Sequence, residues 1–225
     1  MANQRLTIKQ NMRSALCIAL SVIASCAFAQ NEPLGSHAVW EPPGWNFPEN
    51  VKASVPREIL SSFRLSAYNI TLEETSMESV RRRFGGEMGR KGDAGDALEW
   101  LCFQGADATG RWVLWLESGE IDGGSVGSFQ WQRLSSREVL DPRCHALRGP
   151  TSAIRLPLSL KLGAKKTEML EILGEPTTID AERLIYLHEH EETIKGAPFT
   201  TSNIVVVRLR DGIVWAIQVS KTSSS

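Results

Sequence analysis

The sequence has no long hydrophobic run and holds few cysteines, histidines and tyrosines. Of its 225 residues, 4 are cysteine, 4 are histidine and 2 are tyrosine, and the formal net charge is −1. The apolar stretch at residues 15–23 is shorter than the roughly 20 residues that a membrane-spanning helix needs. A near-neutral charge argues against nucleic acid as a partner. These features point away from a membrane-spanning protein and from a nucleic-acid-binding protein.

The first 29 residues have the three parts of a secretory signal peptide. Arg5, Lys9 and Arg13 carry its positive charge, the apolar stretch follows, and Ala-Phe-Ala at 27–29 forms a cleavage site before Gln30. Removal of this leader takes away three positive charges, which changes the formal net charge from −1 to −4. We therefore predict a periplasmic or secreted protein.

A second processing site overlaps the first. Ile-Ala-Ser-Cys at 23–26 resembles the bacterial lipoprotein cleavage site, in which the cysteine becomes the acylated first residue of the mature protein. This resemblance implies that Cys26 is lipidated and that the protein is anchored in the outer membrane. Ordinary cleavage before Gln30 would leave no such cysteine, so the two products are alternatives.

Two cysteines follow the leader, Cys102 and Cys144. An oxidising compartment favours a disulfide between them. In the chain-entropy account, closing this loop would stabilise the protein by about 4 kcal/mol, less any strain. Two separate buried thiols are the alternative.

Hydrophobic periodicity predicts two similar halves about ninety residues apart. In each half an alternating apolar stretch leads into a short helix that ends at glycine, and three strand-like segments follow. The first helix ends at Gly85, and the second covers about 165–173 and ends at Gly174. The predicted fold class is α+β, with two tandem repeats, each a short helix packed on an antiparallel β-sheet.

The same patterns set the predicted domain boundaries. Residues 1–29 are the signal peptide, 30–55 a proline- and tryptophan-rich extended arm, 56–140 the first helix-plus-sheet repeat and 141–225 the second. Within the first repeat, Pro56 is expected to begin a short helix. Each repeat is expected to include an alternating strand before its main helix.

Two alternating segments of the second repeat give sharper predictions. A strict period of two predicts a strand over 154–162. The Asp211-Gly212 pair between apolar runs predicts a β-hairpin, and a two-residue turn there places Arg208 opposite Trp215. Both faces of this hairpin are apolar, so one of them needs a lid, a partner or a second copy of the chain.

The segment G-A-K-K-T-E-M-L-E-I-L-G-E-P-T at 163–177 resembles the helix motif of BamE-like proteins, the small lipoprotein component of the β-barrel assembly machinery. Two such units in tandem resemble the β-lactamase inhibitor protein, whose repeats pack short helices on four-stranded antiparallel sheets. The first copy departs from the motif, with Ser79 where the second has Glu168. Both families bind proteins without catalysis. The resemblance therefore implies a noncatalytic protein-binding module, or an outer-membrane lipoprotein assembly factor.

Aromatic residues in the expected strands are the candidate contact residues. Tryptophan is enriched at the centres of protein interfaces. The predicted partner-binding residues are Trp115, Phe129, Trp131 and Trp215. We expect them to bind an envelope or secreted protein through the sheet surface and a cleft between the repeats. The alternative is that these rings fill the core.

A histidine-rich stretch is the candidate metal site. On a strand, His188, His190 and Glu192 share one face, and two histidines with a carboxylate form catalytic zinc sites. A metal-dependent hydrolase is therefore the alternative function. The acids among these residues also suit a charged strand edge that prevents unwanted pairing. We adopt that interpretation and predict no catalytic residue, metal or cofactor.

Two further motifs have simpler explanations. Residues 123–127 match the G-x-S-x-G nucleophile pattern, but strand-like residues follow where the motif needs a helix, so we predict a hairpin loop. Arg81, Arg82 and Arg83 form a basic cluster that could contact anionic lipid. A solvated helix face is the interpretation we prefer.

Overall fold

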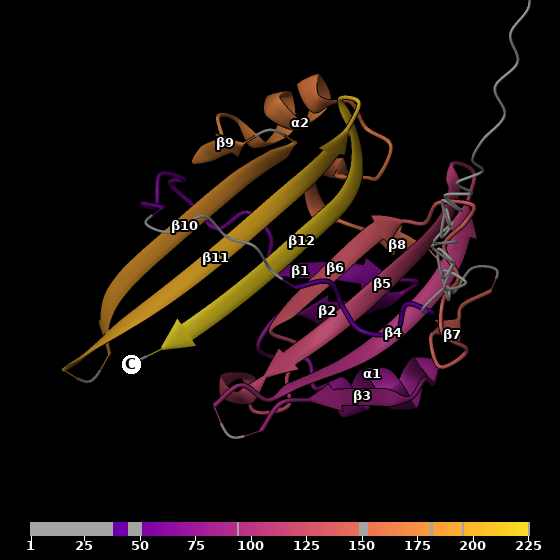
Figure 1. The fold of residues 1–225 in the computed structure, drawn as a ribbon. Helices are drawn as coiled ribbons and strands as arrows, with labels where there is room; N and C mark the ends of the chain where they lie inside the picture. The colour runs from indigo at the N-terminus through magenta and orange to yellow at the C-terminus, as the bar shows by residue number, and fades with distance from the viewer. Residues whose placement is uncertain are drawn as a thin grey trace, which may run out of the picture. The chain divides into compact units, whose positions relative to one another are not determined.

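Antiparallel β-sheet dominates the part of the chain that the computed structural model describes (Figure 1). That part comprises residues 38–44, 51–93, 95–148, 153–180, 182–194 and 196–224. It holds two short α-helices, α1 (Met77–Phe84) and α2 (Lys166–Leu173). The protein is therefore of the α+β type, as the sequence predicts.

The larger sheet has nine strands. Eight follow the order β3-β4-β5-β6-β12-β11-β10-β9, and β7 pairs in parallel with β4. Their bounds are β3 Met88–Lys91, β4 Leu98–Asp107, β5 Gly110–Gly119, β6 Ser128–Arg133, β7 His145–Ala146, β9 Thr178–Asp180, β10 Arg183–Ile194, β11 Ala197–Arg210 and β12 Ile213–Ser224. The N-terminal and C-terminal groups of strands meet where β6 pairs with β12.

Five strands of the larger sheet follow α1 and four follow α2, where the sequence predicts three after each helix. The additional strands are β3, β7 and β9, which have 4, 2 and 3 residues. Strands this short show no alternation that could be recognised in the sequence. A helix followed by four antiparallel strands occurs twice in the chain, with the short parallel strand β7 between the two occurrences, while the duplication itself stays a prediction.

Both helices end at the glycines that the sequence predicts. The Ser76 hydroxyl caps α1 by accepting a hydrogen bond from the Ser79 backbone N–H. Glu168 accepts one from the Lys165 N–H at the start of α2. Gly85 and Gly174 follow the last helical residues, with φ of 81° and 80°. That left-handed φ favours glycine, which explains why both helices end there.

A smaller sheet has the order β2-β1-β8, with β1 at Ser62–Leu65, β2 at Tyr68–Thr71 and β8 at Ile154–Arg155. The helix predicted to begin at Pro56 is wrong, because residues 51–61 contain no helix. The backbone N–H groups of Ile59 and Leu60 instead donate to the side chain of Asn203 in β11. A tertiary hydrogen bond thus replaces the helical ones.

The strand predicted over 154–162 is also wrong beyond β8. Pro157 has no N–H for a strand ladder, and it begins the short 3₁₀ turn Pro157–Ser159. Leu158 and Ser159 have positive φ, at 57° and 60°. The alternating leucines at 156, 160 and 162 are nevertheless buried. The alternation of these leucines therefore comes from an irregular segment that faces the core, and it does not come from a strand.

The β11–β12 hairpin turns at Asp211-Gly212 as predicted. Both residues have positive φ, at 53° and 73°, as a two-residue type I′ turn requires. The predicted pairing of Arg208 with Trp215 is wrong, because a bulge shifts the register and places Arg208 opposite Ala216. A one-residue shift moves every later side chain to the other face.

This shift decides which side chains of β12 reach the main core. Ile217 and Val219 lie in the same buried cluster as Val205 and Val207 of β11, whereas an unbulged hairpin would have placed them on the opposite face. The main core thus lies between the larger sheet and a layer formed by α1, the smaller sheet and α2.

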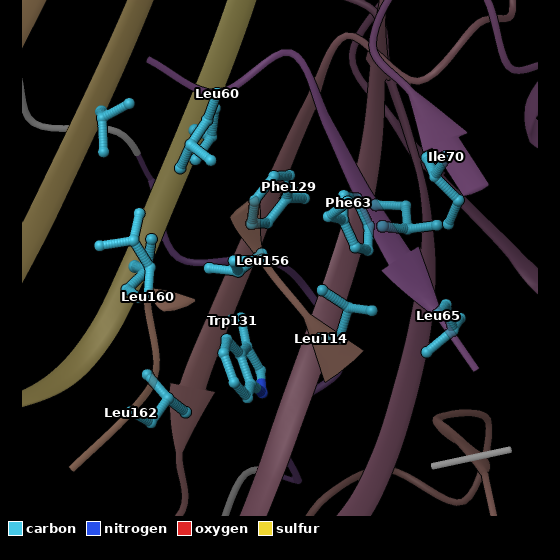
Figure 2. Packing of buried hydrophobic residues seen from close by; sticks show 14 of the residues in the cluster. Leu60, Phe63, Leu65, Ile70, Leu114, Phe129, Trp131, Leu156, Leu160 and Leu162 are labelled. Atoms are coloured by element: carbon cyan, nitrogen blue, oxygen red, sulfur yellow. The ribbon is translucent and has the colours of Figure 1, made fainter. Parts of the chain in front are cut away.

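Figure 2 shows part of this core, where side chains of the smaller sheet meet those of the larger one. The rings of Phe63 in β1 and Phe129 in β6 lie side by side, with centroids 4.4 Å apart. Both rings are buried. Full burial of a side chain of this size stabilises the fold by about 2 kcal/mol.

Candidate functional site

The other face of β4 and β5 is covered by the chain itself. Trp40, in the described segment 38–44, packs edge-on against Trp100 with centroids 5.8 Å apart. The Trp115 indole N–H donates to the Trp40 carbonyl oxygen at 3.1 Å, and the Gln130 amide donates to that of Pro43 at 2.7 Å. The described arm segment therefore forms a lid over β4 and β5, whereas the lid or partner that the sequence predicts belongs to the β11–β12 hairpin and stays a prediction.

The disulfide between Cys102 and Cys144 is confirmed, and it lies beneath this segment of the arm. It joins β4 to the loop that follows β6, across 42 residues of chain. Both cysteines are buried with Trp40 and Trp100 in a second, smaller core. A disulfide fits an oxidising, extracytoplasmic compartment.

Three of the four predicted partner-binding aromatic residues lie inside the protein. Trp115 and Phe129 have no exposed surface, and Trp131 is 4% exposed. The arm covers Trp115 and the smaller sheet covers Phe129, so these rings do not form the accessible surface that the prediction requires. Trp215 is half-buried. Partner binding remains a prediction for that residue.

An open and largely apolar cleft of about 840 Å³ lies elsewhere. Three segments form it, namely residues 54–59, the 3₁₀ turn at 157–158 and the C-terminal end of α2 at 172–175. Its apolar lining comprises Val55, Pro56, Ile59, Pro157, Leu158, Ile172 and Leu173. We call it the α2 cleft.

Strand β10 anchors two walls of the α2 cleft. The backbone N–H groups of Ser54 and Val55 both donate to the Leu187 carbonyl oxygen at 3.2 Å. The hydroxyl of Tyr186 donates to the Gly174 carbonyl oxygen, also at 3.2 Å, where α2 ends. Hydrogen bonds between residues distant in sequence therefore attach two walls of the cleft to the same strand.

The third wall depends on backbone geometry. Leu158 has φ of 57° and its side chain is 48% exposed at the edge of the cleft. A left-handed φ is rare for leucine. Alternation places this leucine with its buried neighbours, so neither its exposure nor the cleft could be recognised from the sequence.

Charged groups of both signs line the rim. Arg57 and Glu175 are exposed there, and Glu58 forms an ion pair with Lys221 at 3.3 Å. Burial, and after it the charge of Glu175, raises the pKa of Tyr186 to about 12. Tyr186 is therefore neutral at physiological pH and acts as a hydrogen-bond donor. An apolar lining with a mixed charged rim suits an amphipathic protein segment.

The histidine-rich stretch runs along an outer edge of the larger sheet. His188 is held by a 2.8 Å hydrogen bond between its Nδ1 and the Val55 carbonyl oxygen, and His190 and Glu192 are exposed. In the described residues no three histidine, cysteine or acidic side chains are grouped so that they could hold a metal ion. Strand β9 pairs with β10 only up to Ile185, so β9 leaves this charged edge open.

The other sequence motifs lie away from the α2 cleft. Residues 123–127 form a loop between β5 and β6 with strand and no helix after it, as predicted. Arg81, Arg82 and Arg83 are exposed in the last turn of α1, and Arg81 pairs with Glu78 at 2.7 Å. The signal peptide and Cys26 lie outside the described residues. Within those residues, no helix has the length and hydrophobicity to span a membrane.

Comparisons with known proteins assign no family. No protein family matches the sequence, and no curated protein matches it. Among solved structures, a proposed β-lactamase inhibitor protein from Streptococcus mutans is similar, with 16% sequence identity over 69% of this chain and 89% of that chain and a TM-score of 0.23. A TM-score this low supports no conclusion about function. The BamE-like resemblance has no support from a family match.

Proposed function

We propose that this protein is an exported, noncatalytic binding module that holds another protein of the cell envelope in the α2 cleft. The observation that carries the proposal is the cleft itself, an open concavity lined by apolar side chains. Concave apolar sites with a few polar groups are the common form of binding site. Exposed apolar surface of this kind often marks protein–protein contacts.

Residues of both predicted repeats line the α2 cleft. Ile59 belongs to the predicted first repeat, whereas Leu158 and Ile172 belong to the second, and all three line the cleft. A cleft between two repeats is the location that the sequence analysis predicts for partner binding. The tandem repeat is part of this proposal, and so is the partner's origin in the envelope.

Site-specific crosslinking tests the α2 cleft. A photoreactive amino acid at Leu158 should give a discrete adduct with a partner in intact cells, whereas the same group at Ile121 should give none. Ile121 is a matched control because it is 75% exposed and does not line the cleft. Leu158→Glu should remove partner capture, because a carboxylate would be placed against apolar surface. Equal adducts at both positions, or none at either, would refute the proposal.

Export and anchoring are also part of the proposed function. Mass spectrometry of the mature N-terminus distinguishes the two products. Cleavage before Gln30 gives an unmodified soluble protein, whereas cleavage before Cys26 gives an acylated one. The disulfide supports export in either case.

A further inference from the structure

A cluster of arginines lies on the face of β10 and β11 that points away from the main core. Arg183 and Arg208 are direct cross-strand partners. Arg210, two residues further along β11, stacks on the Trp215 ring at 4.9 Å from its centroid. The neighbouring residues Leu184 and Leu209 are in the main core, so strand alternation places the arginines on the opposite face. We call Arg183, Arg208, Arg210 and Trp215 the Arg208 surface.

The charges within this surface are unevenly compensated. Like charges on directly opposite strand positions destabilise a sheet. Asp180 offsets the charge of Arg183, with both carboxylate oxygens 2.9 Å from the Arg183 Nε. The acceptor of Arg208 is instead neutral, since its Nε donates to the Gln218 side-chain oxygen at 3.0 Å. Burial first, and then the charge of Arg183, lowers the pKa of Arg208, while Asp180 acts in the opposite direction.

Buried amides hold the Arg208 guanidinium in place. The Gln218 side chain is 2% exposed and donates to the Gln130 side-chain oxygen. Gln130 donates in turn to a Glu117 carboxylate oxygen at 2.8 Å. This chain fixes the amide oxygen that receives the Arg208 Nε–H. Among the described residues, the Gln218 side chain accepts a hydrogen bond from the Arg208 Nε–H. The two terminal NH₂ groups of Arg208 are therefore left to bind an external acceptor.

We propose that the Arg208 surface is a second contact site, at which Arg208 and Arg210 bind carboxylates of an acidic segment of the partner protein. A planar guanidinium with a fixed orientation suits a carboxylate, which it can bind through two parallel hydrogen bonds. Arginine and tryptophan are also the residue types most enriched at energetically important interface positions. The assignment of the acidic group to a protein rests on the proposed function. The preference of the surface for an anion rests on its own arginines.

The net charge of the chain makes this inference testable. Because the formal net charge is negative, general electrostatics opposes the binding of a polyanion. A fluorescein-labelled oligoglutamate peptide and the full-length mature protein are the test pair, with fluorescence anisotropy at low ionic strength as the measurement. We expect saturable binding that weakens as salt is added, because exposed charges become screened.

Single substitutions locate the binding. Arg208→Gln should weaken peptide binding about tenfold, which is the loss expected for a charge-assisted hydrogen bond. Arg210→Gln should act in the same direction and is the backup if Arg208→Gln fails to fold, because Arg210 is exposed. Arg64→Gln is the matched control, since Arg64 is an exposed strand arginine in the smaller sheet. It should leave binding unchanged.

Three outcomes would overturn the inference. The first is that the wild type does not bind the peptide. The second is that the wild type, Arg208→Gln and Arg210→Gln bind it equally well. The third is that Arg64→Gln loses as much peptide affinity as the other two variants. Vesicles containing phosphatidylglycerol form the second arm of the experiment. Arg208-dependent binding to vesicles without binding to the peptide would assign the surface to lipid instead. None of these results alters crosslinking at Leu158, so the two proposals fail separately.

Discussion

At the scale of single residues, two glycine–tryptophan pairs show how closely the larger sheet is packed. Gly89 lies opposite Trp100, and Gly105 lies opposite Trp112, on paired strands. A Cβ atom at Gly89 would come within 2.1 Å of the Trp100 ring, and one at Gly105 within 2.3 Å of the Trp112 ring. The indoles therefore occupy space that any other residue would fill. Such pairs depend on strand register, which the sequence alone does not reveal.

Tyr186 supports a prediction about pH at the same scale. Its pKa is raised from 10.0 to about 12 in the folded protein. Above pH 10 the unfolded chain loses this proton first, so stability should fall as the pH rises from about 10 to about 12. Tyr186→Phe removes the ionisable group and should flatten that decline. At neutral pH the variant should lose about 1 kcal/mol, from the hydrogen bond to Gly174.

Urea unfolding of the wild type and Tyr186→Phe across this pH range tests the prediction. The difference between the two proteins isolates Tyr186 from the other groups that titrate at alkaline pH. An identical alkaline decline in both proteins would show that burial of the hydroxyl does not control its ionisation.

At the scale of elements, the face of β4 and β5 opposite α1 depends on irregular segments. The described arm segment 38–44 supplies Trp40, and the loop after β6 supplies Cys144. Short segments without a ladder of their own need tertiary bonds to remain in place. The disulfide and the hydrogen bonds from Trp115 and Gln130 provide those bonds.

Removal of the disulfide should weaken this arrangement. We expect the double variant Cys102→Ala and Cys144→Ala to lose up to about 4 kcal/mol of unfolding free energy, because its unfolded chain is no longer constrained by the loop. Urea unfolding measures the loss. Reductant should destabilise the wild type and leave the double variant unaffected, which separates the bond from the packing of the side chains. Equal sensitivity of both proteins to reductant would contradict the prediction.

At the scale of the whole molecule, Asn203 connects the two layers. Its side chain is 1% exposed. Its oxygen accepts from the N–H groups of Ile59 and Leu60 at 3.1 and 3.4 Å, and its nitrogen donates to the carbonyl oxygens of Leu60 and Ser220 at 2.8 and 3.1 Å. One amide therefore ties the segment that leads into the smaller sheet to two strands of the larger sheet.

Asn203→Ala should therefore destabilise the whole protein. The change leaves several buried backbone groups without partners, and each such group costs about 1–3 kcal/mol, so a total loss of about 3 kcal/mol is expected. Asn69→Ala is the control, because the Asn69 side chain is exposed. That control should change the unfolding free energy by less than about 0.5 kcal/mol. Similar values for the two variants would refute the role of Asn203 as the link between the layers.

The sequence alone was sufficient for the features that local signals control. Gly85 and Gly174 end the two helices and Asp211-Gly212 forms the hairpin turn. The pairing of Cys102 with Cys144 followed from their being the two cysteines after the predicted leader. Helix ends and tight turns are decided within a few residues, by positive φ and by capping side chains. The general α+β character follows from the same signals.

Only the tertiary structure decided which surfaces are accessible. Trp115 is buried because Trp40, far away in the sequence, covers it. The bulge beside Arg208 reverses the faces of β12, and the positive φ of Leu158 exposes a residue that its periodicity places in the core. Burial depends on contacts between distant segments and on strand register, and neither leaves a local signal in the chain. For that reason the α2 cleft and the Arg208 surface could be recognised only in the folded protein.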